Sequence, residues 1–104
     1  MNILLLGSGG REHAFAYLLS RSPRCKQLYI APGNAGTALE GENVAMDATD
    51  FPKIKEFCLS KQISLVVVGP EEPLVKGIVD FFAQDTVLSQ IPIVGPSQKG
   101  ATLE

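Results

Sequence analysis

The sequence carries little net charge and has no long apolar run. Nine Lys and Arg against eleven Asp and Glu leave a formal charge of −2 over 104 residues. This balance gives no basic field for nucleic acid or an anionic membrane, so any anion site must be local. No apolar stretch approaches membrane-spanning length, and the first residues lack the basic-then-apolar pattern of a signal peptide. We therefore expect a cytoplasmic protein that binds neither nucleic acid nor membrane.

Cysteine and histidine are scarce. The two cysteines, Cys25 and Cys58, have no metal-ligand spacing and indicate no disulfide framework. Cys58 lies on the apolar side of an expected helix, and we interpret it as a buried, inert thiol. His13, the only histidine, follows a glycine-rich turn, and both a structural and a ligand-contacting role stay open for it. We expect no metal site in this chain.

Two common nucleotide-binding motifs are incomplete. The dinucleotide fingerprint G-x-G-x-x-G needs a third glycine and an acidic residue about 20 positions further on. Gly7 and Gly9 fit it, but Glu12 holds the third position, where helix and strand should pack closely. The second expected strand ends at Pro32 without a carboxylate, and the Gly-Lys-Ser/Thr of a P-loop is missing. A dinucleotide-dependent oxidoreductase domain is therefore only an alternative interpretation.

The most informative segment is the glycine turn after the first apolar run. Residues 3–6 predict a buried strand, and three glycines follow within residues 7–10. A strand, a glycine turn and a helix start direct several N–H groups and the positive end of a helix dipole at one point. Arg11 can add a forked, charged donor there. The glycines could serve only a tight turn, but with Arg11 they favour an anion site that includes Gly9 and Gly10.

Strand-like and helix-like segments alternate along the chain. The expected strands are residues 2–6, 26–31, 43–46, 64–68 and 91–94, and the expected helices are about 11–20, one capped by Thr49 or Asp50 and ending near 60, and one ending near 83. Residues 85–90 are expected to form a polar linker. Alternation with short connections predicts one α/β domain with an open, mostly parallel, Rossmann-like sheet of about five strands and helices on both faces.

The helices are expected to direct apolar residues toward this sheet. These residues are Ala14, Phe15, Leu18 and Leu19 on the first helix, and Leu74, Ile78, Phe81 and Phe82 on the third. A further helix starts at Ser97 and has little more than one turn before Glu104. A domain seldom ends inside a new helix, so we expect a fragment of a longer protein.

Three unusual loops are expected to meet at one edge of the sheet. Parallel strands end at the same edge, and open α/β sheets bind ligands there. In residues 32–37, small residues offer free N–H groups, so Gly33, Asn34 and Gly36 are expected to form a second wall beside the glycine turn. After the fourth strand, Glu71 either stabilises a helix start or accepts hydrogen bonds from ligand hydroxyls or an amine. Together the loops predict one site for a small phosphorylated molecule.

Four motifs in order also indicate a family. They are Gly7-Ser-Gly-Gly-Arg-Glu-His13, Pro32-Gly-Asn-Ala-Gly-Thr37, Gly69-Pro-Glu-Glu-Pro-Leu74 and Gly95-Pro-Ser-Gln98. Over nearly all 104 residues the chain resembles the N-terminal domain of the glycinamide ribonucleotide synthetases, also called phosphoribosylamine–glycine ligases, of the ATP-grasp superfamily. The resemblance implies a pre-ATP-grasp type of fold.

The resemblance further implies a reaction in purine synthesis. ATP, glycine and 5-phosphoribosylamine give glycinamide ribonucleotide, ADP and phosphate, with the glycine carboxylate activated as an acyl phosphate. Magnesium or manganese accompanies the ATP, and the ligands of both lie in an ATP-grasp module that would begin beyond Glu104. By this resemblance the ATP-grasp and C-terminal domains are absent from residues 1–104. The chain alone is then expected to be inactive and to hold no catalytic residue.

The resemblance places this domain on the phosphoribosylamine side of the active-site cleft. By position, the substrate-binding residues are expected to be Gly9, Gly10 and Arg11 near the 5′-phosphate or ribose, Gly33, Asn34 and Gly36 on the adjacent wall, and Glu71 near the ribose hydroxyls or the amine. A non-catalytic sugar-phosphate-binding module remains a second alternative. The sequence leaves open the oligomeric state and whether the parent enzyme is fused to other domains.

Overall fold

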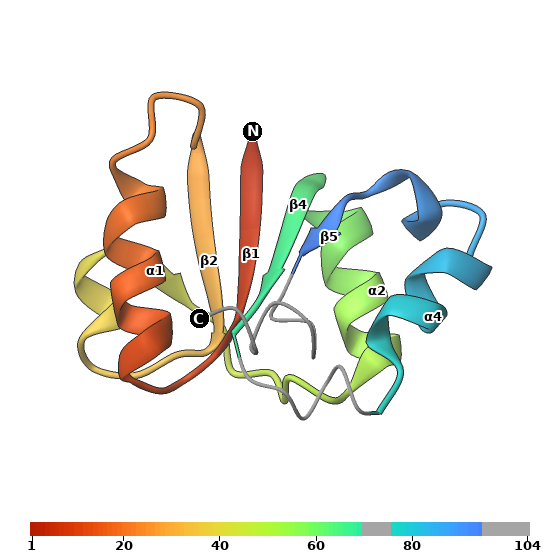
Figure 1. Ribbon diagram of the computed structural model, residues 1–104, viewed down its shortest axis with the longest axis horizontal. Helices are drawn as coiled ribbons and strands as arrows, with labels where there is room; N and C mark the ends of the chain where they lie inside the picture. Colours follow the sequence, from red (N-terminus) through yellow and green to blue (C-terminus); the bar gives the residue numbers. More distant parts are fainter. Residues whose placement is uncertain (70–75, 95–104) are drawn as a thin grey trace, which may run out of the picture.

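The computed structural model of the protein describes residues 1–69 and 76–94, except for the side chain of Arg11. Within these residues lies a sheet of five parallel strands in the order β3-β2-β1-β4-β5 (Figure 1). The strands are β1 (Asn2–Gly7), β2 (Gln27–Pro32), β3 (Glu42–Asn43), β4 (Ile63–Val68) and β5 (Ile93–Val94). The predicted parallel sheet of about five strands is confirmed.

Strand β1 lies at the centre of the sheet because it is apolar on both faces. Its residues 3–6 are at most 3% exposed, as a parallel strand covered on both sides requires. The register aligns Gly7 with Pro32 of β2 and Leu6 with Val68 of β4. The three central strands therefore end at the same level, and the loops that follow them start side by side.

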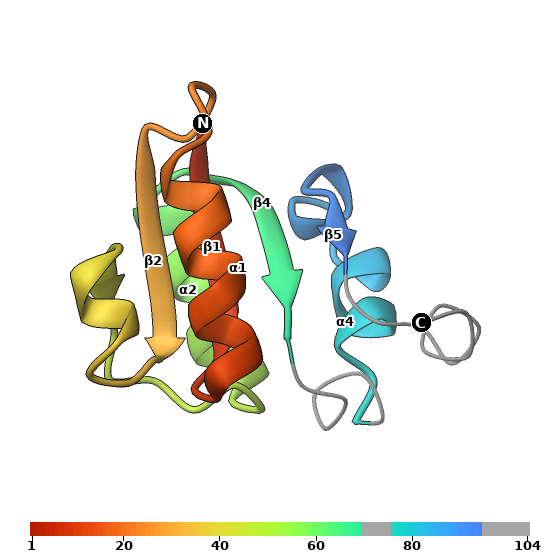
Figure 2. The ribbon, with the colours of Figure 1, turned by 60° about the vertical axis from the view of Figure 1, so that its left-hand side comes forward.

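Helices cover both faces of the sheet, as predicted. Helix α1 (Gly10–Ser20) packs on one face, and α2 (Phe51–Ser60) and α4 (Ile78–Gln84) pack on the other (Figures 1 and 2). Two short 3₁₀ helices, η1 (Thr37–Leu39) and η2 (Leu88–Gln90), follow β2 and α4. The direction of connection reverses at β1, since α1 leads to β2 on one side and α2 leads to β4 on the other.

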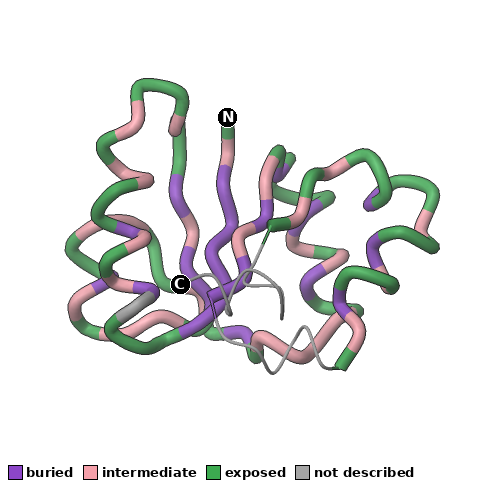
Figure 3. Tube along the Cα trace, viewed as in Figure 1, coloured by how far each residue is buried: buried purple, intermediate pink, exposed green. Residues whose placement is uncertain are grey.

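The two faces bury unequal amounts of apolar surface. Figure 3 shows the buried positions concentrated along the central strands and the helix sides that face them. Under α1 the buried residues are Ile3, Leu5, Ala16, Leu28 and Ile30. Under α2 and α4 they are Leu4, Leu6, Ala31, Met46, Ile54, Cys58, Ile63, Val66, Val68, Ile78, Phe82 and Leu88. The predicted burial of Cys58 is confirmed, and burial raises the pKa of its thiol to about 12.

The predicted inner side of α1 is partly wrong. Ala16 is fully buried against the sheet, with Phe15 and Leu19 packed beside it, whereas Leu18 is 66% exposed and Ala14 faces solvent. The helix carries apolar residues all round, so periodicity alone does not determine which side faces the sheet. The position of the helix along the sequence was therefore predicted correctly, but the side of the helix that faces the sheet was not.

The third predicted strand is shorter than expected. Residues 43–46 were expected to be extended, but β3 contains only Glu42 and Asn43. The N–H of Val44 donates to Ile30 O of β2, and the N–H of Met46 then donates to Val44 O. This second bond turns the chain away from β2 after Val44.

The predicted polar linker at residues 85–90 contains η2. The Asp85 carboxylate accepts hydrogen bonds from the N–H groups of Val87 (2.9 Å) and Leu88 (3.0 Å). Leu88 itself is fully buried in the core under α2 and α4. Two adjacent apolar residues, Val87 and Leu88, within a short polar stretch were too weak a signal to predict the burial of Leu88.

Helix α4 supplies the aromatic residues that were expected in the core. Phe82 is 1% exposed, and the Phe81 ring lies 5.4 Å from the Phe51 ring of α2 between centroids. Helix α4 begins at Ile78, after Gly77 with a φ of 93°, so residues 76–77 are a turn and not part of the helix that was predicted to run through them. The predicted start near Leu74 and the helix from Ser97 lie outside the described residues.

Candidate functional site

The loops after β1 and β2, and Gly69 directly after β4, lie at the carboxyl edge of the sheet, as predicted, while the rest of the third loop lies outside the described residues. The N–H of Gly33, after β2, donates to Gly7 O, after β1, at 2.9 Å. The N–H of Gly69, after β4, donates to Leu6 O at 2.9 Å. Backbone hydrogen bonds therefore join the start of the second loop and Gly69 to the end of β1, at the edge where ligands of such sheets bind.

The first loop is a glycine turn in which one position, Gly7, requires glycine. Gly7 has a φ of +139°, which side chains strongly disfavour, and a Cβ there would overlap the Glu12 side chain. Gly9 is extended and precedes the first residue of α1, Gly10, around which a Cβ would meet nothing within 4 Å. The inner side of the turn, at Gly7, is therefore filled by the Glu12 side chain. The outer side, at Gly10, is open.

The Glu12 carboxyl group fills the inner side of this turn. Glu12 is 5% exposed, and its Oε2 accepts a hydrogen bond from the N–H of Gly9 at 3.1 Å. An acid in the first helical turn is favoured by the helix dipole. The anion that the glycine turn was expected to attract is thus supplied in part by the chain itself. Sequence reasoning used Glu12 only to weigh against a dinucleotide site and missed this contact.

The outer side of the turn presents the start of α1. The first N–H groups of a helix have no carbonyl partner one turn earlier, so those of Gly10 and Arg11 lie at the positive end of the dipole. The Arg11 backbone is in the first turn of the helix, and its side chain lies outside the described part of the chain. The expectation that Gly9, Gly10 and Arg11 bind a phosphate stays a prediction.

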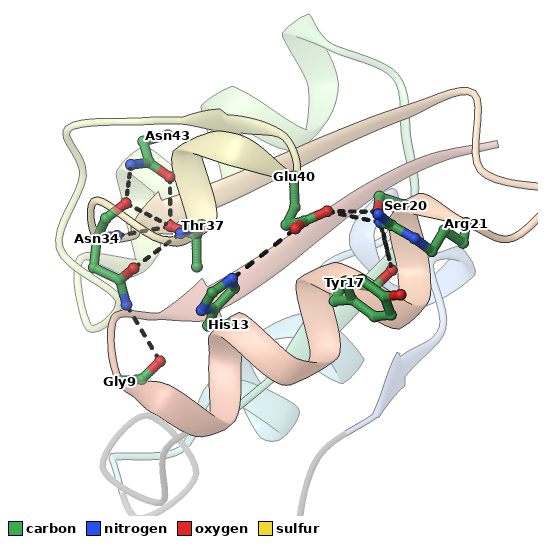
Figure 4. Close-up of polar contacts among 9 residues, drawn as sticks. All are labelled: Gly9, His13, Tyr17, Ser20, Arg21, Asn34, Thr37, Glu40 and Asn43. Atoms are coloured by element: carbon green, nitrogen blue, oxygen red, sulfur yellow. Dashed lines mark hydrogen bonds and ion pairs between the residues drawn. The ribbon is translucent and has the colours of Figure 1, made fainter.

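The second loop is attached to the first by the Asn34 side chain. Asn34 Nδ2 donates to Ser8 O at 2.6 Å and lies 3.3 Å from Gly9 O, while its Oδ1 accepts from the N–H of Thr37 at 2.9 Å. Figure 4 shows this amide bridging the two loops. The amide therefore holds the second loop against the first. In this arrangement Asn34 contributes to the shape of the candidate site.

Two residues that sequence reasoning missed fix the backbone of Asn34. The hydroxyl of buried Thr37 accepts from the N–H of Asn34 at 2.7 Å and lies 2.7 Å from Asn43 Oδ1. Asn43 Nδ2 donates to Asn34 O at 2.7 Å. The Asn-x-x-Thr spacing within the loop was the available signal, since such side chains often close turns on their own backbone.

Glycine permits the close approach of this loop to its neighbours at two positions. Gly33 has a φ of +78°, and a Cβ there would overlap Asn43. A Cβ on Gly36 would lie 2.7 Å from His13 Nδ1. The structure thus brings Gly33, Asn34 and Gly36 together against the first loop, as expected, although no contact with a ligand tests their proposed role.

His13 lies near the second loop and faces a partly buried acid, Glu40. Its Nε2 is 4.0 Å from Glu40 Oε1, and its side chain is 43% exposed (Figure 4). Glu40 is held mainly by Arg21, whose Nη1 lies 2.8 Å from Oε2, and this bond lowers the pKa of the Glu40 carboxyl group. Ser20 donates a further hydrogen bond to Glu40 at 3.2 Å. This cluster attaches η1 to α1.

An open depression of about 460 Å³ runs along α1 from the edge of the site. It is lined by Gly10, His13, Ala14, Tyr17 and Leu18. The Arg21 guanidinium covers the Tyr17 ring with its carbon 3.7 Å from the ring centroid. Gly10 therefore belongs both to the glycine turn and to this depression.

The described residues offer no donor set for a metal ion. Among residues 1–69 and 76–94 no three His, Cys, Asp or Glu side chains come together in a way that could hold one. Glu71, the acid expected near the ligand, lies outside the described residues. In the part of the chain that the structure describes, no helix has the length and apolar character needed to cross a membrane.

The fold and its edge define a class of domain: an open parallel α/β sheet with a glycine-lined candidate ligand site at the carboxyl ends of its central strands. The family follows from comparison with known proteins. The chain belongs to the family of the phosphoribosylglycinamide synthetase N domain, whose model matches residues 1–104. This confirms the resemblance that the four sequence motifs indicated.

Relatives of high identity share one name. The phosphoribosylamine–glycine ligase of Haemophilus influenzae is 50% identical over 106 residues, which take in 100% of this chain and 24% of that protein. The ligase of Mesorhizobium japonicum is 52% identical over 104 residues, and that of Escherichia coli K12 is 46% identical over 106, with the same coverage. The chain thus spans about a quarter of the length of the curated relatives it matches.

A solved structure agrees with the sequence relatives. The crystal structure of phosphoribosylamine–glycine ligase from Thermotoga maritima superposes with a TM-score of 0.55 at 26% sequence identity. The match covers 100% of this chain and 22% of the Thermotoga chain. The α/β fold described above is therefore shared with a ligase of that name.

Proposed function

We propose that this chain is the N-terminal part of an ATP-dependent ligase that joins glycine to 5-phosphoribosylamine and yields glycinamide ribonucleotide, ADP and phosphate. The family match over residues 1–104 carries the proposal. Relatives about half identical over the whole chain, all named phosphoribosylamine–glycine ligase, support it. The activity belongs to purine synthesis and, as expected from the sequence, to the cytoplasm.

In this proposal the domain holds the phosphoribosylamine. Gly9, Gly10 and Arg11 offer N–H groups and a guanidinium to the 5′-phosphate, where the dipole of α1 favours negative charge. The wall of Gly33, Asn34 and Gly36 excludes water beside it, and Glu71 accepts hydrogen bonds from the ribose or the amine. The open outer side of Gly10 and the short bridge from Asn34 to Ser8 support this arrangement.

ATP and magnesium or manganese are assigned to parts of the parent enzyme beyond residue 104. The described residues contain no cluster of metal ligands, and the sequence has no P-loop motif. Glycine is likewise assigned to those other parts. The 104-residue chain is then inactive alone and contributes one wall of the cleft.

Two other functions are less well supported. A dinucleotide-dependent oxidoreductase domain would need a third glycine for close packing of helix and strand, at the position where Glu12 stands with its carboxyl group inside the glycine turn. A non-catalytic sugar-phosphate-binding module would need a natural open reading frame that encodes no further domains. Detectable NAD(P) binding would support the first, and the length of the reading frame decides the second.

The experiment is a steady-state assay of glycinamide ribonucleotide formation by the full-length parent enzyme. Product should require ATP, glycine and 5-phosphoribosylamine together. Arg11→Ala removes the proposed phosphate contact and should raise the KM for 5-phosphoribosylamine by about tenfold or more. Glu71→Gln should also impair product formation.

The matched control is Arg24→Ala, which removes an exposed arginine from the connection before β2. It should leave all three KM values unchanged. Absence of product in the wild-type enzyme would refute the proposed function. Wild-type kinetics for both Arg11→Ala and Glu71→Gln would refute the site assignment alone.

A further inference from the structure

One buried charged side chain has no part in the proposed substrate contacts. Glu12 leaves the first turn of α1 and enters the space between the ends of β1 and β4, where it is 5% exposed. Its Oε2 lies 3.1 Å from the Gly9 nitrogen, and its Oε1 would lie 2.5 Å from a Cβ on Gly69. A buried carboxyl group costs stability unless it is compensated, so its retention there needs a reason.

The position of Glu12 is the reversal point of the sheet. Strand β1 is connected to β2 on one side, and β4 lies on its other side. Ligands of open α/β sheets bind in the crevice outside such a point. Here the crevice is occupied by the chain's own carboxyl group, and the start of α1 with the Gly9 N–H compensates its negative charge.

Helix capping alone does not account for the surroundings of Glu12. A cap needs only one acceptor for one N–H, and here Glu12 Oε2 accepts from the N–H of Gly9. Yet a Cβ on either Gly7 or Gly69 would overlap the same side chain, and Gly7 ends β1 whereas Gly69 directly follows β4. The ends of β1 and β4 are thus both shaped to receive Glu12.

We propose that Glu12 is a positioning residue that fills the crevice between β1 and β4, fixes the ends of both strands, and confines the substrate phosphate to the outer side of the glycine turn. This inference rests on the proposed function, because it names what determines the phosphate position in that site. A carboxylate in the crevice repels a second anion there. The outer side, at Gly10, is open, since a Cβ would meet nothing within 4 Å.

The first arm of the test asks whether removal of the Glu12 side chain relieves the steric overlap that an added methyl group creates, in the full-length parent enzyme. Gly69→Ala places a methyl group against the Glu12 carboxyl group and should raise the KM for 5-phosphoribosylamine. Glu12→Ala removes the obstacle, so the double variant should recover part of the loss that Gly69→Ala causes. Gly7→Ala is the matched control, because its φ of +139° remains strained whether or not Glu12 is present.

The second arm separates positioning from general stability. Glu12→Ala should raise the KM for 5-phosphoribosylamine about tenfold and leave those for ATP and glycine unchanged, because only the loops of this domain lose their support. Glu12→Gln keeps the shape and an acceptor for Gly9 and should stay within about threefold of wild type. A loss of stability alone would lower the amount of active enzyme and kcat without selecting one KM.

The outcomes separate this inference from the proposed function. If the wild-type parent forms no glycinamide ribonucleotide, the proposed function fails, while thermal unfolding of the Gly69→Ala and Glu12→Ala pair still tests the packing. If the wild type is active, an unchanged KM in Glu12→Ala or no recovery in the double variant overturns the inference. Should Glu12→Ala not fold, Gly69→Ala and Glu12→Gln give the same decision through their KM values.

Discussion

The two faces of the sheet are stabilised in different ways. Among the described residues, the face under α2 and α4 joins twelve buried apolar residues in one cluster, whereas the face under α1 joins five. On the α1 side the loops are connected instead by the side chains of Asn34, Thr37 and Asn43. Apolar burial is not directional, but hydrogen bonds are. We infer that the first face supplies most of the stability and the second supplies the geometry of the site.

The largest effect should follow from a cavity under α2 and α4. Phe82→Ala removes a ring that is 1% exposed and should lower the free energy of unfolding by about 3–5 kcal/mol. Val79→Ala, on the exposed side of the same helix, should change it by less than about 0.5 kcal/mol. Urea unfolding followed by circular dichroism checks both values. Equal losses for the two variants would contradict the assignment of stability to this face.

A smaller effect on stability, with a distinct effect on the site, should follow from Thr37→Val. This change keeps the shape but leaves the N–H of Asn34 without the acceptor that lies 2.7 Å away. The free energy of unfolding should fall by about 1–3 kcal/mol. In the parent enzyme the KM for 5-phosphoribosylamine should rise, because the second loop loses its fixed geometry. Thr86→Val, an exposed change, should alter neither quantity.

The smallest effect on the free energy of unfolding should come from Asp85, in the connection after α4, and it should depend on pH. A bond from Lys55, together with the N–H groups of Leu88 and Val87, lowers the pKa of Asp85 from 3.8 to about 2. Since the folded pKa lies below the unfolded one, the contribution to stability is present above about pH 4 and is lost as the pH falls toward 2. Asp85→Asn should therefore destabilise the chain at pH 6 and much less at pH 2.5.

Urea unfolding at several pH values measures this difference. Glu56→Gln, which changes an exposed carboxyl group on α2, serves as the control and should not reproduce the profile of Asp85→Asn. A constant difference between wild type and Asp85→Asn across this pH range would show that the Lys55–Asp85 pair does not act through its charge.

The sheet and the meeting of the loops could be predicted because their signals are local. The run at residues 3–6 is apolar on both faces, which determines a central parallel strand, and glycines follow it directly. The phase of α1 could not be predicted, since Ala14, Ala16 and Leu18 are all apolar and only packing selects Ala16. Neither could the burial of Leu88, which depends on residues far away in the sequence.

Within the candidate site, positions could be predicted but contacts could not. Gly33 and Asn34 were placed on the second wall correctly, because parallel strands end at one edge. The hydrogen-bond partners of Asn34 and the burial of Glu12 depend on contacts with other segments of the chain. The spacing of residues within one loop does not determine these contacts. Glu71 falls outside the described residues, and its role stays a prediction.

The central claim is that the carboxyl edge of this domain holds the sugar phosphate. The most direct measurement is an NMR titration of the isotopically labelled 104-residue chain with ribose 5-phosphate, with NAD and ATP as controls. The account predicts chemical-shift changes confined to residues 7–13, 32–37 and 69–74 with ribose 5-phosphate alone. No change at this edge, or changes with NAD alone, would contradict it.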